Sequence, residues 1–210
     1  MALRALEGHP MREPFVEFVK RELGQKTLLI TCGLPASWKS ETTEVVEKLK
    51  GYKRLRTDMI RLEVWKGQDV FDEKVASNMH NREMVYDAMF RMADQLAAAG
   101  QSVILDATFV TQSLRKRAAE VAARHDMTFV IQQTQCPQEV SLRRIAKRTR
   151  ENYESNAITE QAYFNNLKKF EPVDLEDLKA SFPNLRIVHL LVDTSEDPPE
   201  SWYVIGKTVR

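Results

Sequence analysis

The stretch TLLITCGLPASWKSETTEVVEKL, residues 27–49, decides how the rest of the chain is interpreted. An apolar run rich in strand formers passes into a helical segment through Gly33, four further residues, Trp38 and then Lys39 and Ser40. This spacing follows the pattern G-x-x-x-x-G-K-[ST] of loops that wrap phosphate groups, except that tryptophan stands at the second glycine. The alternative is an ordinary strand-to-helix turn with a solvated Lys39.

The position of the loop between a strand and a helix favours nucleotide binding. Backbone N–H groups of such a loop and the helix N-terminus form an anion site. Lys39 is expected to reach the outer phosphates, and the Ser40 hydroxyl is expected to bind Mg²⁺. The predicted nucleotide-binding residues are Gly33, Leu34, Pro35, Ala36, Ser37, Trp38, Lys39, Ser40, Glu41 and Thr42.

Trp38 is the departure from the pattern. Glycine lets the backbone approach the phosphates closely, and a Cβ narrows that approach. If the position requires a positive φ, a non-glycine residue costs about 1–2 kcal/mol. The indole can also turn outward and cover the nucleotide or the acceptor. The sequence therefore predicts compromised or altered nucleotide binding, which Trp38→Gly is expected to improve.

Strands and helices alternate along the rest of the chain. Five apolar strands separated by helices predict an α/β three-layer sandwich with a parallel sheet covered on both faces. Strands are expected at 26–32, 52–57, 102–107, 127–134 and 185–192, and helices at 13–23, 39–50, 58–65, 78–99, 111–125, 137–150 and 159–170. The polar tail from Asp193 onward is expected to lie on the surface.

Asp58 follows one strand of this predicted sheet, and Asp106 stands at the end of another. Right-handed crossovers bring the carboxyl ends of parallel strands to one edge, where ligands bind. Asp58 and Arg61 lie on one face of a helical turn there, so Asp58 can take a proton from an attacking hydroxyl and Arg61 can hold an anionic group. A surface ion pair, or a helix cap by Asp58, is the alternative.

Asp106 ends the strand SVILDA, residues 102–107. A carboxylate at this place is suited to support Mg²⁺, often through water. The alternative is that Asp106 caps the following helix, but Thr108 and Thr111 are also able to do so.

A basic segment follows the fourth strand. Five of the eight residues from Arg143 to Arg150 are basic, and Arg144 and Arg148 are expected on one helix face. Beside the polar stretch 151–157 they suggest a small helical lid, within residues 137–170, that brings arginines to a transferring phosphate. A solvated basic helix face is the alternative.

The overall composition fits one globular domain over residues 1–210. The net charge is +1, so no global field recruits nucleic acid or membrane. Two cysteines provide no disulfide framework, and no apolar run reaches the length of a membrane span. We therefore expect a cytoplasmic protein.

Together these motifs resemble the P-loop kinases related to AAA-type ATP-binding kinases, which include phage polynucleotide 5′-hydroxyl kinase, gluconate kinase and zeta toxins. The resemblance covers about Lys26 to Val192. DMIR is similar to their D-x-x-R, LDATF to their acidic strand end, RIAKR to their lid arginines, and SNAITEQAY to the segment after the lid in stand-alone members. It implies that Asp58 is the general base and that Arg61 binds substrate phosphate.

The resulting expectation is a kinase that uses ATP and Mg²⁺, with Asp58, Lys39, Arg144 and Arg148 as catalytic residues. Polynucleotide 5′-kinase-like transfer to a hydroxyl acceptor, with nucleic acid as a candidate partner, stands beside two alternatives. These are a small-molecule (sugar or nucleotide-sugar) kinase and a non-enzymatic nucleotide-binding protein. Arg61, Asp106, Arg82 and Tyr86, together with His80, are the candidate substrate-binding residues for either kinase.

Overall fold

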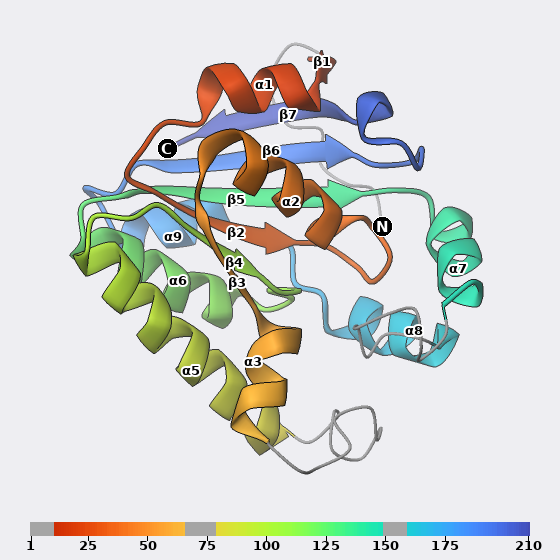
Figure 1. The fold of residues 1–210 in the computed structure, drawn as a ribbon, viewed down its shortest axis with the longest axis horizontal. Helices are drawn as coiled ribbons and strands as arrows, with labels where there is room; N and C mark the ends of the chain where they lie inside the picture. Colours follow the sequence, from red (N-terminus) through yellow and green to blue (C-terminus); the bar gives the residue numbers. More distant parts are fainter. Residues whose placement is uncertain (1–10, 66–78, 149–158) are drawn as a thin grey trace.

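The computed structural model describes residues 11–65, 79–148 and 159–210 (Figure 1). Within these ranges all strands belong to one seven-stranded sheet, ordered β1-β7-β6-β5-β2-β4-β3. The strands are β1 (Glu13–Pro14), β2 (Thr27–Cys32), β3 (Lys53–Arg56), β4 (Val103–Asp106), β5 (Thr128–Gln135), β6 (Ile187–Asp193) and β7 (Tyr203–Val209).

The five expected strands, β2 to β6, pair in parallel as predicted. The expectation of five strands in all is wrong, because β7 and the short β1 extend the sheet with antiparallel pairing. The tail after Asp193 therefore does not merely lie on the surface. Val204 on β7 and the neighbouring Trp202 are buried in the apolar cluster beside α1, and this burial stabilises the added strand.

Helices cover both faces of the sheet (Figure 1). The helices α1 (Phe15–Glu22) and α2 (Lys39–Lys50) pack on one face, and α5 (Met79–Ala98), α6 (Gln112–Arg124) and α9 (Leu175–Ser181) pack on the other. Successive residues of a strand point to opposite faces, so Leu28 and Ile30 join one core cluster whereas Leu29 joins the other. This confirms the three-layer arrangement.

The remaining helices lie toward the carboxyl ends of the parallel strands (Figure 1). They are α3 (Thr57–Val64), α7 (Gln138–Ala146), α8 (Glu160–Lys169) and the 3₁₀ turn Pro199–Ser201. The α7 helix ends at Ala146, four residues before the predicted end. The polar stretch 151–157 of the predicted lid lies outside the described residues.

No described helix combines the length and the apolar character that crossing a membrane would require.

Candidate functional site

The loop after β2 has the backbone geometry of an anion-binding site. Gly33, Ala36 and Trp38 have positive φ angles of 146°, 60° and 55°. Ala36 and Trp38 alternate with residues of negative φ, a turn that directs successive N–H groups toward one point. Gly33 cannot be replaced without strain, because a Cβ there would lie 2.6 Å from the carbonyl oxygen of Thr134.

Trp38 occupies a left-handed backbone position, as the sequence analysis considered, with φ 55° and ψ 35°. Its indole packs against the apolar cluster on the α1 and α2 face of the sheet. The guanidinium of Arg144 lies over the ring, 4.6 Å from its centroid. Packing and a cation–π contact thus offset the strain of a non-glycine residue at positive φ.

Lys39 begins α2 and reaches back across the loop. Its Nζ donates a hydrogen bond to the carbonyl oxygen of Leu34 at 2.6 Å. Burial lowers the pKa of Lys39 to about 8, and the carboxylate of Asp106 opposes that shift. Arg148 lowers the pKa of Lys39 further, so its positive charge lies within electrostatic reach of the lysine.

Asp58 lies in the first turn of α3 and pairs with Arg61, with 2.9 Å between Oδ1 and Nη1. Asp58 does not cap the helix, because Arg56 is at the N-cap position and no side chain caps it. Its side chain is 26% exposed. Burial raises the pKa of Asp58, whereas Arg61, Arg56 and Lys39 lower it. The carboxylate is therefore held close to the loop lysine rather than in bulk water.

Asp106 ends β4 and is 5% exposed. Its carboxylate accepts hydrogen bonds from Thr43 Oγ1 at 3.3 Å and from the Ser40 hydroxyl. Burial raises the pKa of Asp106. The following helix, α6, is capped by Thr111, which accepts from the N–H of Leu114. Asp106 therefore serves no capping role and faces the beginning of α2.

The pair formed by Ser40 and Asp106 fits a magnesium ion chemically. Both side chains offer hard oxygen donors, and Mg²⁺ is commonly held by one or two protein oxygens together with phosphate and water. Among the described residues no group of three or more His, Cys, Asp or Glu could hold a metal ion. A bound Mg²⁺ would thus depend on the nucleotide for most of its ligands.

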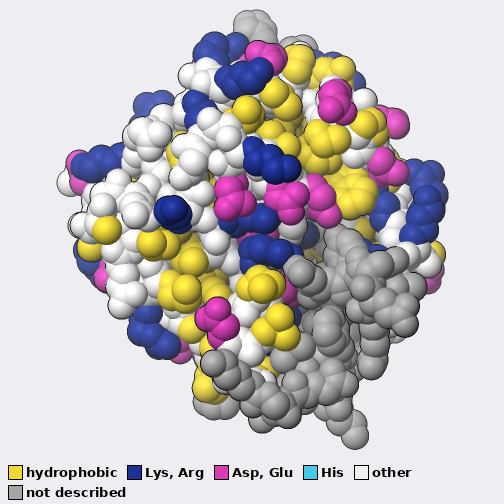
Figure 2. Space-filling view, in the orientation of Figure 1, with side chains coloured by type: hydrophobic (Ala, Val, Ile, Leu, Met, Phe, Trp, Pro, Cys, Tyr) yellow, Lys and Arg dark blue, Asp and Glu magenta, His cyan; other side chains and the backbone are white. Residues whose placement is uncertain are grey.

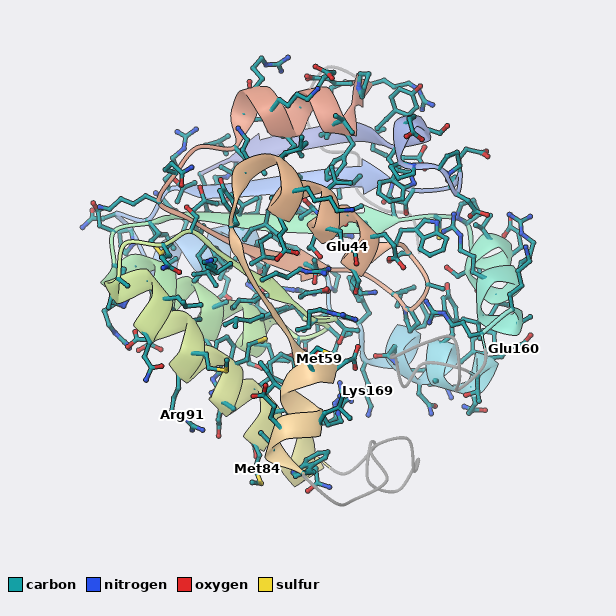
Figure 3. All side chains as sticks on the ribbon, viewed as in Figure 1. Glu44, Met59, Met84, Arg91, Glu160 and Lys169 are labelled. Carbon is teal, nitrogen blue, oxygen red and sulfur yellow. The ribbon has the colours of Figure 1, made fainter. Side chains whose placement is uncertain are left out.

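Two arginines of β3 complete this part of the site, and neither is among the residues predicted from the sequence. Arg54 Nη1 lies 3.7 Å and Arg56 Nε lies 4.0 Å from Asp106 Oδ2. Arg54 also donates to the carbonyl oxygen of Ser40 at 3.0 Å and pairs with Glu44. Figure 3 labels Glu44, which lies on α2. Strand alternation places 54 and 56 on one face, a signal in the sequence KRLR that could have identified them.

Figure 2 shows basic and acidic side chains side by side across the middle of the face that α2 and α3 present. This mixture of charges agrees with the ion pairs of Arg54 and Arg61 with neighbouring carboxylates.

Arg144 and Arg148 do not share a helix face. Arg148 follows the end of α7, whereas Arg144 is 6% exposed within it. The Arg144 guanidinium donates to Asp197 Oδ1 at 2.9 Å and to the carbonyl oxygen of Ala36 at 3.1 Å. It also donates to three carbonyl oxygens of residues 194–196. With these contacts Arg144 does not have the free guanidinium that a lid arginine needs.

Arg82 and Tyr86 come from α5. Tyr86 packs edge-on against Phe109, and only 6% of its surface is exposed. Its hydroxyl bonds to the Thr108 side chain, and burial raises its pKa. Tyr86 is thus placed in the core rather than along an open surface, while Arg82 remains within electrostatic reach of it. The side chain of His80 lies outside the described residues.

A family profile described as an AAA domain matches residues 28–173, more than half of the chain. A comparison with curated protein sequences gives no match.

Solved structures show where the fold recurs. A sugar kinase from Janibacter sp. is 16% identical with a TM-score of 0.59, covering 84% of this chain and 89% of its own. A gluconokinase from Sinorhizobium meliloti is 16% identical with a TM-score of 0.56, covering 84% and 87%. A chain of the Pnkp1/Rnl/Hen1 RNA repair complex is 18% identical with a TM-score of 0.55, covering 78% and 48%. At these sequence identities, the comparison shows that the chains share a fold.

Proposed function

We propose, from the premise that the chain belongs to the AAA-domain family and has the fold of P-loop kinases, that it transfers the γ-phosphate of ATP to an acceptor hydroxyl. One observation carries this proposal most. At the carboxyl edge of the sheet, Lys39 reaches back across the loop to the carbonyl oxygen of Leu34, and the beginning of α2 contacts the buried Asp106 carboxylate through Thr43 Oγ1 at 3.3 Å.

The donor nucleotide would lie on the loop Gly33–Thr42. The N–H groups of the loop and of the first turn of α2 would bind its phosphates, and Lys39 would exchange the carbonyl oxygen of Leu34 for a phosphate oxygen. Ser40 and Asp106 would hold Mg²⁺, which offsets negative charge on the phosphates. Arg148, whose positive charge acts on Lys39, would approach the transferred group.

The acceptor would approach from α3. Asp58 would accept the proton of its hydroxyl, and the raised pKa of Asp58 makes it a stronger base than an ordinary aspartate. Arg61 holds the Asp58 carboxylate in place and would bind an anionic group of the acceptor. The transition state of phosphoryl transfer is loose, so positioned charges of this kind supply most of the catalysis.

For the acceptor we propose a polynucleotide 5′-hydroxyl, because Arg56 and Arg61 place two positive charges beside the proposed base. A small molecule such as a sugar is the second candidate, since the same residues would activate its hydroxyl. The two free thiols, Cys32 and Cys136, favour a reducing compartment, so we propose a cytoplasmic location.

Transfer of label from γ-labelled ATP tests the proposal. The acceptor panel would hold 5′-hydroxyl RNA and DNA oligonucleotides, their 3′-hydroxyl-blocked forms, gluconate and common sugars. We expect label on the 5′ end of an oligonucleotide, with much less label in Lys39→Met and Asp58→Asn. Label on a sugar alone would select the small-molecule alternative. Saturable ATP binding without transfer to any acceptor would favour a non-enzymatic nucleotide-binding protein.

A further inference from the structure

Two consecutive carbonyl groups of the phosphate loop are held from outside the loop. Arg144 Nη1 donates to the carbonyl oxygen of Ala36 at 3.1 Å. Thr194 Oγ1, directly after β6, donates to the carbonyl oxygen of Ser37 at 3.0 Å and lies 3.2 Å from that of Gln135. We call Arg144 and Thr194 the outer clamp.

Peptide geometry gives these two hydrogen bonds a consequence for the inside of the loop. A trans peptide is planar, and its C=O and N–H point in opposite directions. When Arg144 holds the Ala36 carbonyl outward, the N–H of Ser37 is directed inward. When Thr194 holds the Ser37 carbonyl outward, the N–H of Trp38 is directed inward in the same way. These are two successive donors of the predicted anion site.

The outer clamp is itself rigidly supported. Asp197 accepts from Arg144 Nε at 2.9 Å, and the carbonyl oxygens of residues 194–196 accept from Nη2. The indole of Trp38 lies beneath the guanidinium, 4.6 Å from its carbon. The Trp38 indole, which replaces the glycine of the pattern, therefore packs against one face of the Arg144 guanidinium, and Arg144 in turn holds the loop.

We infer that Arg144 and Thr194 are positioning residues that aim the N–H groups of Ser37 and Trp38 at the phosphates of the donor nucleotide. The inference rests on the proposed nucleotide binding. It assigns to Arg144 a role from outside the loop, in place of contact with the transferred phosphate. It also explains why a bulky residue is tolerated at position 38, because that residue packs toward the clamp.

The test uses amide NMR of the whole chain with inorganic pyrophosphate and with Mg·ADP as probes. In the wild-type protein both probes should shift the amide proton signals of Ser37 and Trp38 strongly. Thr194→Val should reduce mainly the Trp38 shift and weaken ADP binding by about fivefold, as the loss of one neutral hydrogen bond predicts. Arg144→Lys should reduce mainly the Ser37 shift.

Thr27→Val is the matched control. Thr27 is also buried and its hydroxyl donates to the carbonyl oxygen of Gly24 at 2.8 Å, but it lies at the opposite end of β2. It should lower thermal stability about as much as Thr194→Val and leave ADP affinity and both amide shifts unchanged.

Three outcomes would overturn the inference. Equal loss of ADP affinity in Thr27→Val and Thr194→Val would show that the outer clamp affects ADP binding only through the general stability of the fold. Unchanged amide shifts in both clamp variants, with wild-type ADP binding, would show that the carbonyl contacts do not direct the donors. Absence of ADP and pyrophosphate binding in the wild-type protein would instead remove the proposed nucleotide site, and the inference would fall with it.

Discussion

The two sides of the phosphate loop differ in what holds them. On the outer side, Arg144 and Thr194 bind backbone carbonyl groups, and most of their partners are neutral. On the acceptor side, Asp58 and Arg61 form a charged pair whose carboxylate is partly exposed. The first arrangement fixes a shape, because backbone contacts leave little freedom. The second keeps charge accessible, which a reacting group requires.

This difference separates residues that position from residues that react. Substitutions on the acceptor side should change the rate more than the stability or the nucleotide affinity. Substitutions on the outer side should change nucleotide affinity and stability together.

Asp58→Asn should reduce phosphoryl transfer by about 10²–10⁴-fold, because loss of a general base has effects of this size. ADP affinity should stay within a few-fold of wild type. Asp87→Asn is the control, since Asp87 pairs with Arg117 away from the loop. Steady-state rates measure turnover, and calorimetry measures ADP affinity. Near-normal turnover in Asp58→Asn would show that the Asp58–Arg61 pair only stabilises the structure and takes no part in the reaction.

Arg148→Ala should lower turnover by about 10²–10³-fold, the usual effect of removing a charged group that stabilises the transition state. It should lower the melting temperature less than Arg144→Ala does, because the Arg148 side chain is half-buried whereas Arg144 is 6% exposed. Arg144→Ala should show the opposite balance, with a clear loss of melting temperature from its buried contacts. Equal effects of the two variants on both measurements would contradict the division between them.

Trp38→Gly should destabilise the fold by about 2 kcal/mol. Loss of indole packing costs about 3 kcal/mol or more, and relief of the positive φ returns about 1–2 kcal/mol. ADP binding should weaken as Arg144 loses its support. Chemical denaturation and calorimetry on the same variant check both effects. Tighter ADP binding would instead show that the indole obstructs the loop, as the sequence pattern alone suggests.

ADP affinity should depend on pH through Lys39. Its pKa is lowered to about 8 in the free protein, and a bound phosphate favours the protonated form. The dissociation constant should be flat below about pH 7 and should rise above about pH 8, by at most about tenfold per pH unit. Lys39→Arg keeps its charge and should flatten the profile. A flat wild-type profile up to pH 9.5 would place Lys39 away from the phosphates.

The sequence predicted the parts of the site that depend on local pattern. The loop between β2 and α2 and the placement of Asp58 and Arg61 on one helical turn follow from spacing within a few residues. The positive φ at Trp38 follows from the glycine that the pattern requires there. Four of the five parallel strands follow from apolar runs, and β3 follows from the alternation in KRLR.

Features that depend on distant contacts could not be read in this way. Arg144 and Ala36 are 108 residues apart, and Thr194 and Ser37 are 157 apart, so neither contact leaves a local signal. The strand β7 contains Gly206 and Lys207, which weaken its pattern, and pairing with β6 stabilises it. The short helix α9 is not predicted because Leu175 and Leu178 give only one turn of apolar spacing.

The central claim is that the loop holding Trp38 binds a nucleotide through its backbone and Lys39. Calorimetric titration of the wild-type protein and of Lys39→Met with Mg·ADP tests it most directly. We predict one saturable site in the wild-type protein and at least about tenfold weaker binding in Lys39→Met, as expected for a charged contact to phosphate. No heat of binding in a folded wild-type protein, or equal affinity in the two proteins, would contradict the claim.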